Sequence, residues 1–232
     1  MGKSGGVSTV VFFKEEEQLS EALTYFDLKD FKDKKTLVKL HMGEMRNRYY
    51  VKPDFVKKVV NEFKKIGSHP FLFDTTVAYN SPRKTKNGYL RVAKLHGFSE
   101  HKIGCPIIIG DKGVVQVVEG RSFEVAEEVF KTPHLVAVSH VKGHVQAGFG
   151  GAIKNFGMGG VTKESKKMIH KGCEPVYNEK NCTLCGECEK ACPFHAIKVK
   201  DRWYWNTKAC LGCGRCVNAC PTDALKFRDA DL

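Results

Sequence analysis

The sequence predicts an α/β domain with a mixed or largely parallel sheet, followed by a small α+β module. Two observations support this fold class. Apolar runs of strand length alternate with segments of helical spacing through the first 175 of the 232 residues, as in βαβ units. Eight of the ten cysteines then fall between Cys182 and Cys220, where that alternation stops. Because Pro175 marks the change of composition, we expect domains at residues 1–175 and 176–232.

The clearest predicted helix lies at residues 53–66. Pro53 suits a first helical turn, apolar residues recur there at three- and four-residue intervals, and Gly67 follows as a stop. Other elements of the first half are predicted from shorter patterns: a strand at 7–13, an amphipathic helix at 15–26, a strand at 36–41 and a buried strand at 70–74.

The alternation continues in the second half of the first domain. In order, the predicted elements are a helix at 87–96, strands at 105–109 and 114–118 around a turn at 110–113, a helix at 123–130, a strand at 135–139 and a basic helix at 162–170. Strands that alternate with helices predict crossover connections, and therefore a largely parallel sheet.

The formal net charge of +12 is concentrated in the first domain. Residues 177–232 hold nine basic and seven acidic residues, a balance of +2, so +10 lies upstream. A basic domain attracts nucleic acid, phosphorylated metabolites or an acidic redox partner, although a solvated lysine-rich surface explains the charge equally well. The sequence shows neither an aromatic platform nor a known nucleic-acid-binding module, so we do not expect nucleic acid as the partner.

The sequence also bears on location. It contains no run of about 18 apolar residues, so no membrane span is expected. The first residues lack the apolar stretch of a signal peptide, which favours a cytoplasmic protein. Since the cytosol keeps thiols reduced, the clustered cysteines indicate metal binding and argue against disulfides.

The eight clustered cysteines form two runs of the pattern C-x2-C-x2-C-x3-C-P, repeated at an offset of 28 residues. In bacterial ferredoxins such runs hold two [4Fe–4S] clusters, and the fourth cysteine of each run ligates the other cluster. We therefore assign the first cluster to Cys182, Cys185, Cys188 and Cys220. We assign the second cluster to Cys210, Cys213, Cys216 and Cys192. The repeat also predicts two pseudo-symmetric halves that share one core.

The chemistry of a cubane explains this pattern. Its irons need soft thiolates presented by a short loop, and glycines inside the runs let the backbone approach. A pair of zinc sites is the alternative, but zinc sites rarely repeat three cysteines at this spacing before Cys-Pro. We therefore expect a ferredoxin-like two-cluster module that transfers electrons. The isolated residues Cys105 and Cys173 are not assigned to metal.

A segment rich in glycine, lysine and histidine, at residues 140–160, is the second candidate site. It follows a predicted strand and precedes a predicted helix, which is where α/β folds bind anions. The residues predicted to move protons or act in catalysis are His140, Lys142 and His144. The residues predicted to bind an anionic ligand are Lys154, Asn155, Gly148, Gly150 and Gly151. The alternative is a glycine-rich hairpin with surface lysines, since no Walker A or dinucleotide-binding pattern is matched.

Two other strand ends carry polar residues and are weaker candidates. His41, the last residue of the predicted strand at 36–41, and Glu44 lie at one strand end, while Asp74, Tyr79 and Arg83 lie at or after the end of the strand at 70–74. Residues at such ends collect in the active sites of α/β proteins.

These motifs together resemble a family of uncharacterised iron–sulfur-centre proteins (domain of unknown function 362), here joined to a bacterial-type two-cluster ferredoxin module. Segment 140–160 carries the resemblance, with further matches such as Gly43-Glu44 and His96-Gly97-Phe98, and it covers most of the chain. It implies a fold and a site but no reaction. Typical members continue past the ferredoxin module with another α/β segment, so we expect either a short form or a partner that completes the site.

Two functions remain open from the sequence. The first is an iron–sulfur redox protein that moves electrons through two [4Fe–4S] clusters, to or from an anionic substrate or cofactor at segment 140–160. The second is a ferredoxin-like electron-relay subunit of a larger complex with no catalytic site. Whether the chain is itself an oxidoreductase is left open. The expected partners are a redox protein and a small anionic substrate, with a homo-oligomer or a completing subunit as further alternatives.

Overall fold

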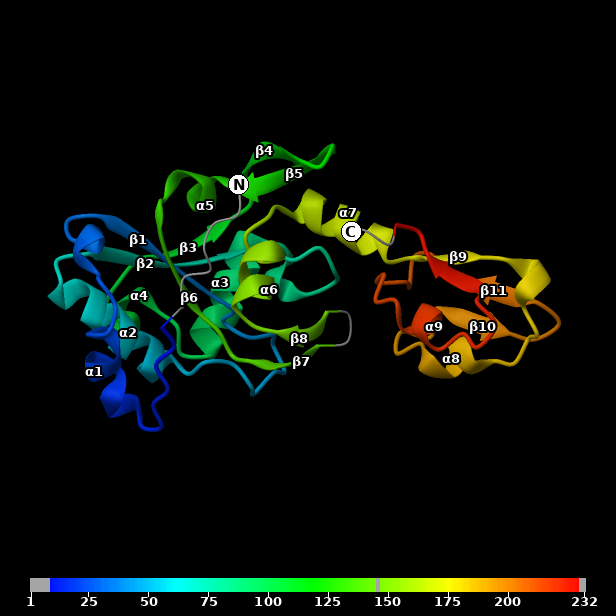
Figure 1. The fold of residues 1–232 in the computed structure, drawn as a ribbon, viewed down its shortest axis with the longest axis horizontal. Coiled ribbons are helices and arrows are strands. Elements are labelled where there is room, and N and C mark those ends of the chain that lie inside the picture. Colours follow the sequence, from blue (N-terminus) through cyan, green and yellow to red (C-terminus); the bar gives the residue numbers. More distant parts are fainter. Residues whose placement is uncertain (1–8, 145–146, 230–232) are drawn as a thin grey trace.

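The computed structural model describes residues 9–144 and 147–229 and shows a four-stranded parallel sheet beside a smaller cysteine-rich module (Figure 1). The strands of the sheet lie in the order β3-β2-β1-β6: β3 (Ile107–Gly110), β2 (His69–Thr75), β1 (Lys35–Leu40) and β6 (His134–Val138). Each neighbouring pair is parallel, with Leu37 opposite both Phe71 and Leu135. The predicted fold class, an α/β domain followed by a small module, is confirmed.

Alternate residues of the strands pack against different faces of the sheet. On one face, Val38 and Leu72 lie in a core with Val60 of α2 (Pro53–Lys65). The same core contains residues of α3 (Lys86–Leu95) and α4 (Glu100–Ile103). On the other face, Leu37 and Phe73 pack with Phe156 of α6 (Ala152–Gly157). Burial on both faces explains why these strands read as continuous apolar runs.

The chain reverses its winding direction beside β1. It passes from β1 to β2 and β3 on one side, and then returns to add β6 on the other side of β1. In open α/β sheets, ligands bind beyond the carboxyl ends of the strands at such a reversal. The carboxyl ends of β1 and β6 therefore mark a place where a ligand site is expected.

The N-terminal elements differ from the prediction. Residues 9–13 of the strand predicted at 7–13 form no strand, and residues 7 and 8 lie outside the described residues. Val10 and Phe12 are exposed, since no neighbouring strand pairs with this segment. The helix predicted at 15–26 is confined to η1 (Glu16–Gln18) and α1 (Leu19–Leu23), and a further short turn follows at η2 (Lys29–Phe31).

The prediction of a helix at 123–130 is wrong for its first four residues. Its first residues belong to β5 (Arg121–Ala126), which pairs antiparallel with β4 (Gly113–Val118), and only α5 (Glu127–Lys131) is helical. A short isolated helix is marginally stable, whereas pairing with β4 satisfies the backbone groups of both strands. The strands on either side of the turn at 110–113 do not pair with each other, because β3 pairs with β2.

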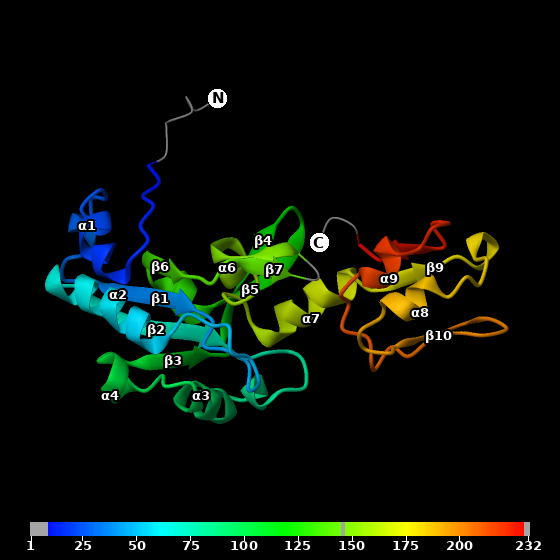
Figure 2. The same cartoon turned by 90° about the horizontal axis from the view of Figure 1, so that it is seen from below.

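The segment that carries the predicted anion site forms a small hairpin and a helix. β7 (Lys142–His144) pairs antiparallel with β8 (Gly148–Gly150), and α6 follows directly. α7 (Lys163–Gly172) then joins the first domain to the cysteine-rich module (Figure 2). One more short turn, η3 (Pro82–Lys84), precedes α3.

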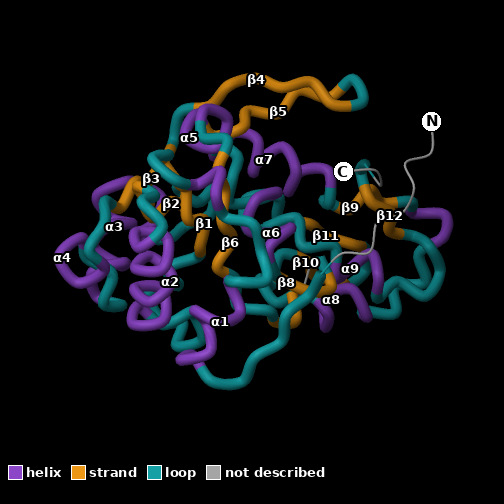
Figure 3. Tube along the Cα trace, turned by 60° about the vertical axis from the view of Figure 1, so that its left-hand side comes forward, coloured by secondary structure: helices purple, strands orange, loops and turns teal. Residues whose placement is uncertain are grey.

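The cysteine-rich module is built from two antiparallel pairs of short strands and two short helices (Figure 3). The strand pairs are β9 (Pro175–Tyr177) with β12 (Leu225–Phe227), and β10 (Ile197–Val199) with β11 (Trp203–Trp205). The helical elements are η4 (Glu179–Asn181), α8 (Glu187–Ala191) and α9 (Arg215–Asn218). Ile197 and Leu225, which are equivalent in the sequence repeat, share one hydrophobic core with Cys216. Among the described helices, none combines the length and apolar character needed to cross a membrane.

Candidate functional site

A cleft of about 480 Å³ lies between the carboxyl ends of the parallel strands and the cysteine-rich module. Its lining includes His41 after β1, Thr75 at the end of β2 and Val138 at the end of β6, while Phe194 and Arg215 come from the module. Small-ligand sites have volumes of roughly 300–1,000 Å³. The cleft therefore has the size and the position of a ligand site in an α/β fold.

Six of the eight predicted residues of segment 140–160 line this cleft. They are His140, Lys142, His144, Gly150, Lys154 and Asn155. Gly148 and Gly151 do not belong to its lining: Gly148 opens β8 with a φ of 70°, and Gly151 precedes α6. The predicted roles of all eight residues stay predictions.

Lys142 and Lys154 converge over Gly150. A Cβ atom built on Gly150 would lie 3.8 Å from Cγ of Lys142 and 3.7 Å from Cδ of Lys154. Within the described residues, neither ammonium group has a hydrogen-bond or ion-pair partner. Burial, together with the charges of Lys142 and Lys39, lowers the pKa of Lys154. Two unpaired lysines facing one cavity are suited to hold an anion.

A buried ion pair supports the floor of the cleft. Nζ of Lys39 lies 2.8 Å from Oδ1 of Asp74, and both side chains are almost completely buried. The same carboxylate accepts hydrogen bonds from the backbone N–H of Thr75 (2.9 Å) and from the hydroxyl of Tyr89. Burial acts to raise the pKa of Asp74, but the nearby cations, Lys39 first among them, hold it well below its usual range. Asp74 is therefore a fixed negative charge that holds Lys39 in place.

Gly159 leaves no room for a side chain above this pair. A Cβ atom there would lie 2.5 Å from Nζ of Lys39 and 2.4 Å from the carbonyl oxygen of Asn155. We expect Gly159→Ala to lower the free energy of unfolding by about 1–3 kcal/mol, because backbone or a buried ammonium must move. Gly157→Ala on α6 is the control: a Cβ there meets nothing within 4 Å and removes the flexibility of a helical glycine. Urea denaturation measures both variants, and equal losses would contradict the steric argument.

Arg83 connects the polar residues predicted at the ends of two strands into one hydrogen-bond network. Its buried guanidinium donates from Nε to Oε1 of Glu44 (2.9 Å) and from Nη2 to the hydroxyl of Tyr79 (3.1 Å). Nη1 lies 3.1 Å from the hydroxyl of Tyr89, which bonds to Asp74. Burial raises the pKa of Tyr79 to about 12, so this hydroxyl stays protonated at neutral pH. Residues from the ends of β1 and β2 thus form a continuous hydrogen-bonded wall.

His41 is part of the same wall as a neutral imidazole. Its Nε2 accepts from Nη1 of Arg83 (2.9 Å), because a guanidinium can only donate, and its Nδ1 lies 3.1 Å from the backbone nitrogen of Gly43. Burial, followed by the charge of Arg83, lowers the pKa of His41 to about 3. A group that protonates only at such acidity cannot exchange protons near neutral pH. His41 therefore contributes to the wall through its hydrogen-bond contacts.

Several residues of the cleft were not predicted as site residues from the sequence. On α7, Lys166 donates to the carbonyl oxygen of Thr76 (2.7 Å), and His170 lies one helical turn further along. Burial lowers the pKa of Lys166 to about 8, and burial also lowers the pKa of His170. Both residues lie in the basic helix predicted at 162–170, four positions apart and therefore on one face of it. This spacing could have identified them as a pair from the sequence. For Lys39, the signal was a lysine inside an apolar strand, since a fully buried lysine is rare unless it is paired.

Positive charge exceeds negative charge in this cleft. The cationic side chains of its lining are Lys39, Arg83, Lys142, Lys154, Lys166 and Arg215. The lining carboxylates are Glu44 and Asp74, and they are paired with Arg83 and Lys39. The lysines without carboxylate partners therefore leave a positive potential in the cleft, which favours anionic ligands.

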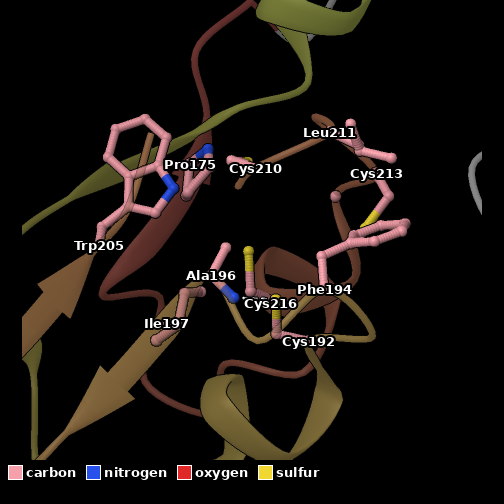
Figure 4. A pocket seen from close by; sticks show the side chains of 11 residues that line it. Pro175, Cys192, Phe194, Ala196, Ile197, Trp205, Cys210, Leu211, Cys213 and Cys216 are labelled. Carbon is pink, nitrogen blue, oxygen red and sulfur yellow. Dashed lines mark hydrogen bonds between the residues drawn. The ribbon is translucent and has the colours of Figure 1, made fainter. Parts of the chain in front are cut away.

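Two further hollows lie in the module, and each combines cysteines of both runs. One is lined by Cys182, Cys185, Cys188 and Cys220. The other is lined by Cys192, Cys210, Cys213 and Cys216 (Figure 4). All ten cysteines are free of disulfides. Each hollow thus brings together the four cysteines of one crosswise set, while the assignment of these sets to clusters stays a prediction.

The donor set of each hollow suits an iron–sulfur cluster. Backbone N–H groups point at the sulfur atoms: Ala196 donates to Cys192 (3.3 Å) and Gly212 donates to Cys210 (3.4 Å). Hydrogen bonds to the sulfurs are a usual feature of cluster sites. Gly214, at a φ of 72°, is required because a Cβ there would lie 2.5 Å from the ring of Phe227. Within residues 9–144 and 147–229, no three His, Cys, Asp or Glu side chains gather around a site for one metal ion.

The second hollow and the cleft are adjacent. Phe194, Leu211 and Cys213 belong to the lining of both. The hollow that contains Cys182 shares no lining residue with the cleft. The two hollows are therefore not equivalent with respect to the candidate ligand site.

Comparisons with known proteins agree with this division of the chain. Residues 36–201 match the family described as Domain of unknown function (DUF362), a span that contains most of the cleft. Residues 181–224 match the 4Fe-4S dicluster domain and contain all eight clustered cysteines. No curated protein matches the chain.

Proposed function

The chain belongs to the DUF362 family and carries a 4Fe-4S dicluster domain, and from this premise we propose that it exchanges electrons between two [4Fe–4S] clusters and an anionic ligand in the cleft. The observation that carries the proposal is the shared lining: Phe194, Leu211 and Cys213 separate the second hollow from the cleft. Clusters bound in the two hollows supply one-electron chemistry, at potentials that the surrounding protein sets. The crosswise cysteine assignment is part of this proposal.

The residues of the cleft divide the remaining work. Lys142 and Lys154 bind the anionic group of the ligand, because both line the cleft and neither ammonium group has a hydrogen-bond or ion-pair partner within the described residues. His140 and His144 lie beside them in the lining and move protons to or from the ligand. Asn155 donates from Nδ2 to Oγ of Ser139 (2.6 Å), which connects α6 to the segment that follows β6.

Lys154→Ala is the direct test of the anion site. We expect the affinity for inorganic pyrophosphate, measured by titration calorimetry, to fall about tenfold to a hundredfold, as the loss of one charge-assisted hydrogen bond predicts.

In the native chain, the affinity for pyrophosphate should also fall as the pH rises through about 8. Lys166 loses its positive charge over that range because its pKa is lowered to about 8.

Lys167→Ala provides the matched control. Lys167 lies on α7 next to Lys166, but its side chain is exposed near Glu164 and is not part of the cleft lining. Its replacement removes the same charge and should change the affinity less than twofold at moderate salt, because exposed charges are screened. Equal effects of the two variants would contradict the site. A native chain that binds neither phosphate nor pyrophosphate would leave an electron relay as the better function.

A further inference from the structure

Two tryptophans of β11 each bring an indole ring to one of the cysteine hollows. Trp203 lines the hollow that contains Cys182, and Trp205 lines the hollow that contains Cys192 (Figure 4). The two residues are separated by one position and so share a face of the strand, while Tyr204 between them faces the other way. One strand thus serves both hollows in the same manner.

Within the described residues, neither indole N–H group has an oxygen or nitrogen acceptor. The Nε1 atoms of Trp203 and Trp205 are buried, and within the described residues neither makes a hydrogen bond. An indole nitrogen can only donate, and native structures rarely leave a buried donor without an acceptor. The side chain of Trp203 does interact with the thiol of Cys188, which is assigned to the first cluster. A cluster in each hollow would supply sulfur acceptors to both indole donors, and the thiolate of Cys188 is one such acceptor beside Trp203.

Packing holds both rings in these positions. Trp203 stacks on Tyr177 with a centroid distance of 4.5 Å and an interplanar angle of 19°, and Trp205 lies 6.0 Å from Trp203. Across the hairpin, Trp205 is opposite Ile197 and Trp203 is opposite Val199. Both indoles are partly buried and pack against the hydrophobic core of the module, and these contacts favour the observed ring positions.

We propose that Trp203 and Trp205 each donate an N–H···S hydrogen bond to the cluster in their own hollow, and that each bond raises the reduction potential of that cluster. Reduction adds one negative charge to a cluster, and a fixed donor stabilises the more negative state to a greater extent. The inference rests on the two clusters of the proposed function and is independent of the ligand in the cleft.

The sharpest test replaces each tryptophan by 3-benzothienylalanine, which keeps the bicyclic shape and lacks the N–H group. The reconstituted full chain is titrated anaerobically and followed by electron paramagnetic resonance. At a fixed potential, the ratio of reduced to oxidised cluster should fall about tenfold for one cluster, which equals a shift of about 59 mV to more negative potential. The Trp203 and Trp205 replacements should shift different clusters, and the double replacement should shift both.

Two controls separate the hydrogen bond from packing. Tyr204→Phe, on the opposite face of β11, should leave both potentials unchanged. Resonance Raman spectra should show deuterium-sensitive Fe–S stretching bands that each replacement removes for one cluster. Potentials that do not move, in variants that keep about eight irons per chain, would overturn the assignment. A native chain that binds far fewer irons would contradict the two clusters themselves, and this inference with them.

Discussion

Alanine in place of Cys192 is expected to remove the cluster assigned to the second cysteine run and to leave about four of about eight irons per chain. Cys192 belongs to the first run in sequence, yet it lines the hollow of Cys210, Cys213 and Cys216. Loss of one of four thiolates leaves an iron of that cubane without its ligand. Iron and sulfide analysis of anaerobically reconstituted protein measures the loss, and electron paramagnetic resonance shows the cluster that remains.

Double variants distinguish the crosswise assignment from a run-by-run one. Cys192→Ala combined with Cys210→Ala should still retain about four irons, because both cysteines line one hollow. Cys192→Ala combined with Cys188→Ala should lose nearly all iron, since these cysteines line different hollows. The opposite pattern would show that each run holds its own cluster. Cys173→Ala is the control, because this free cysteine lines neither hollow.

Lys39→Met is expected to lower the free energy of unfolding by about 3–5 kcal/mol. The replacement keeps much of the side-chain volume but leaves the carboxylate of Asp74 without the cation 2.8 Å away. Because this pair is almost completely buried, water cannot solvate the remaining charge. Urea denaturation at pH 7, without added anion, measures the change.

An exposed ion pair supplies the comparison for this variant. Lys102 lies 3.1 Å from Asp54, and both side chains are exposed to solvent. Lys102→Met should therefore cost less than about 1 kcal/mol. If Lys39→Met cost no more than this control, the buried pair would not support the floor of the cleft as argued.

The burial of charge at the carboxyl edge of the sheet is consistent with a binding role for the cleft. A hydrophobic core gains little from ion pairs, since desolvation offsets most of their attraction. Here two ion pairs, Lys39 with Asp74 and Arg83 with Glu44, line the same cleft as Lys142 and Lys154, which are unpaired within the described residues. The paired residues hold the wall of the cleft, and the unpaired ones remain available to a ligand.

Sequence patterns predicted the local elements well where periodicity and burial agreed. The helix predicted at 53–66 is α2 (Pro53–Lys65), whose apolar residues face the core. The patterns failed where a partner strand decided the outcome. Residues 9–13 have strand-like composition but no neighbouring strand, and residues 121–126 pair with β4 although their sequence also suits a helix. Strand formation depends on a distant segment, which a local pattern does not contain.

The sequence by itself determined the chemistry of this protein: thiolate runs spaced for iron–sulfur clusters, and a glycine-rich segment with lysines and histidines after a strand. Only the tertiary structure decided which of these groups meet. It brought Cys192 into the hollow of the second run, and it joined Lys39 and Lys166 to Lys154 around one cleft. The physical reason is that parallel strands and a connecting helix bring residues more than 100 positions apart to the carboxyl ends of the strands. A local sequence pattern does not contain this long-range arrangement.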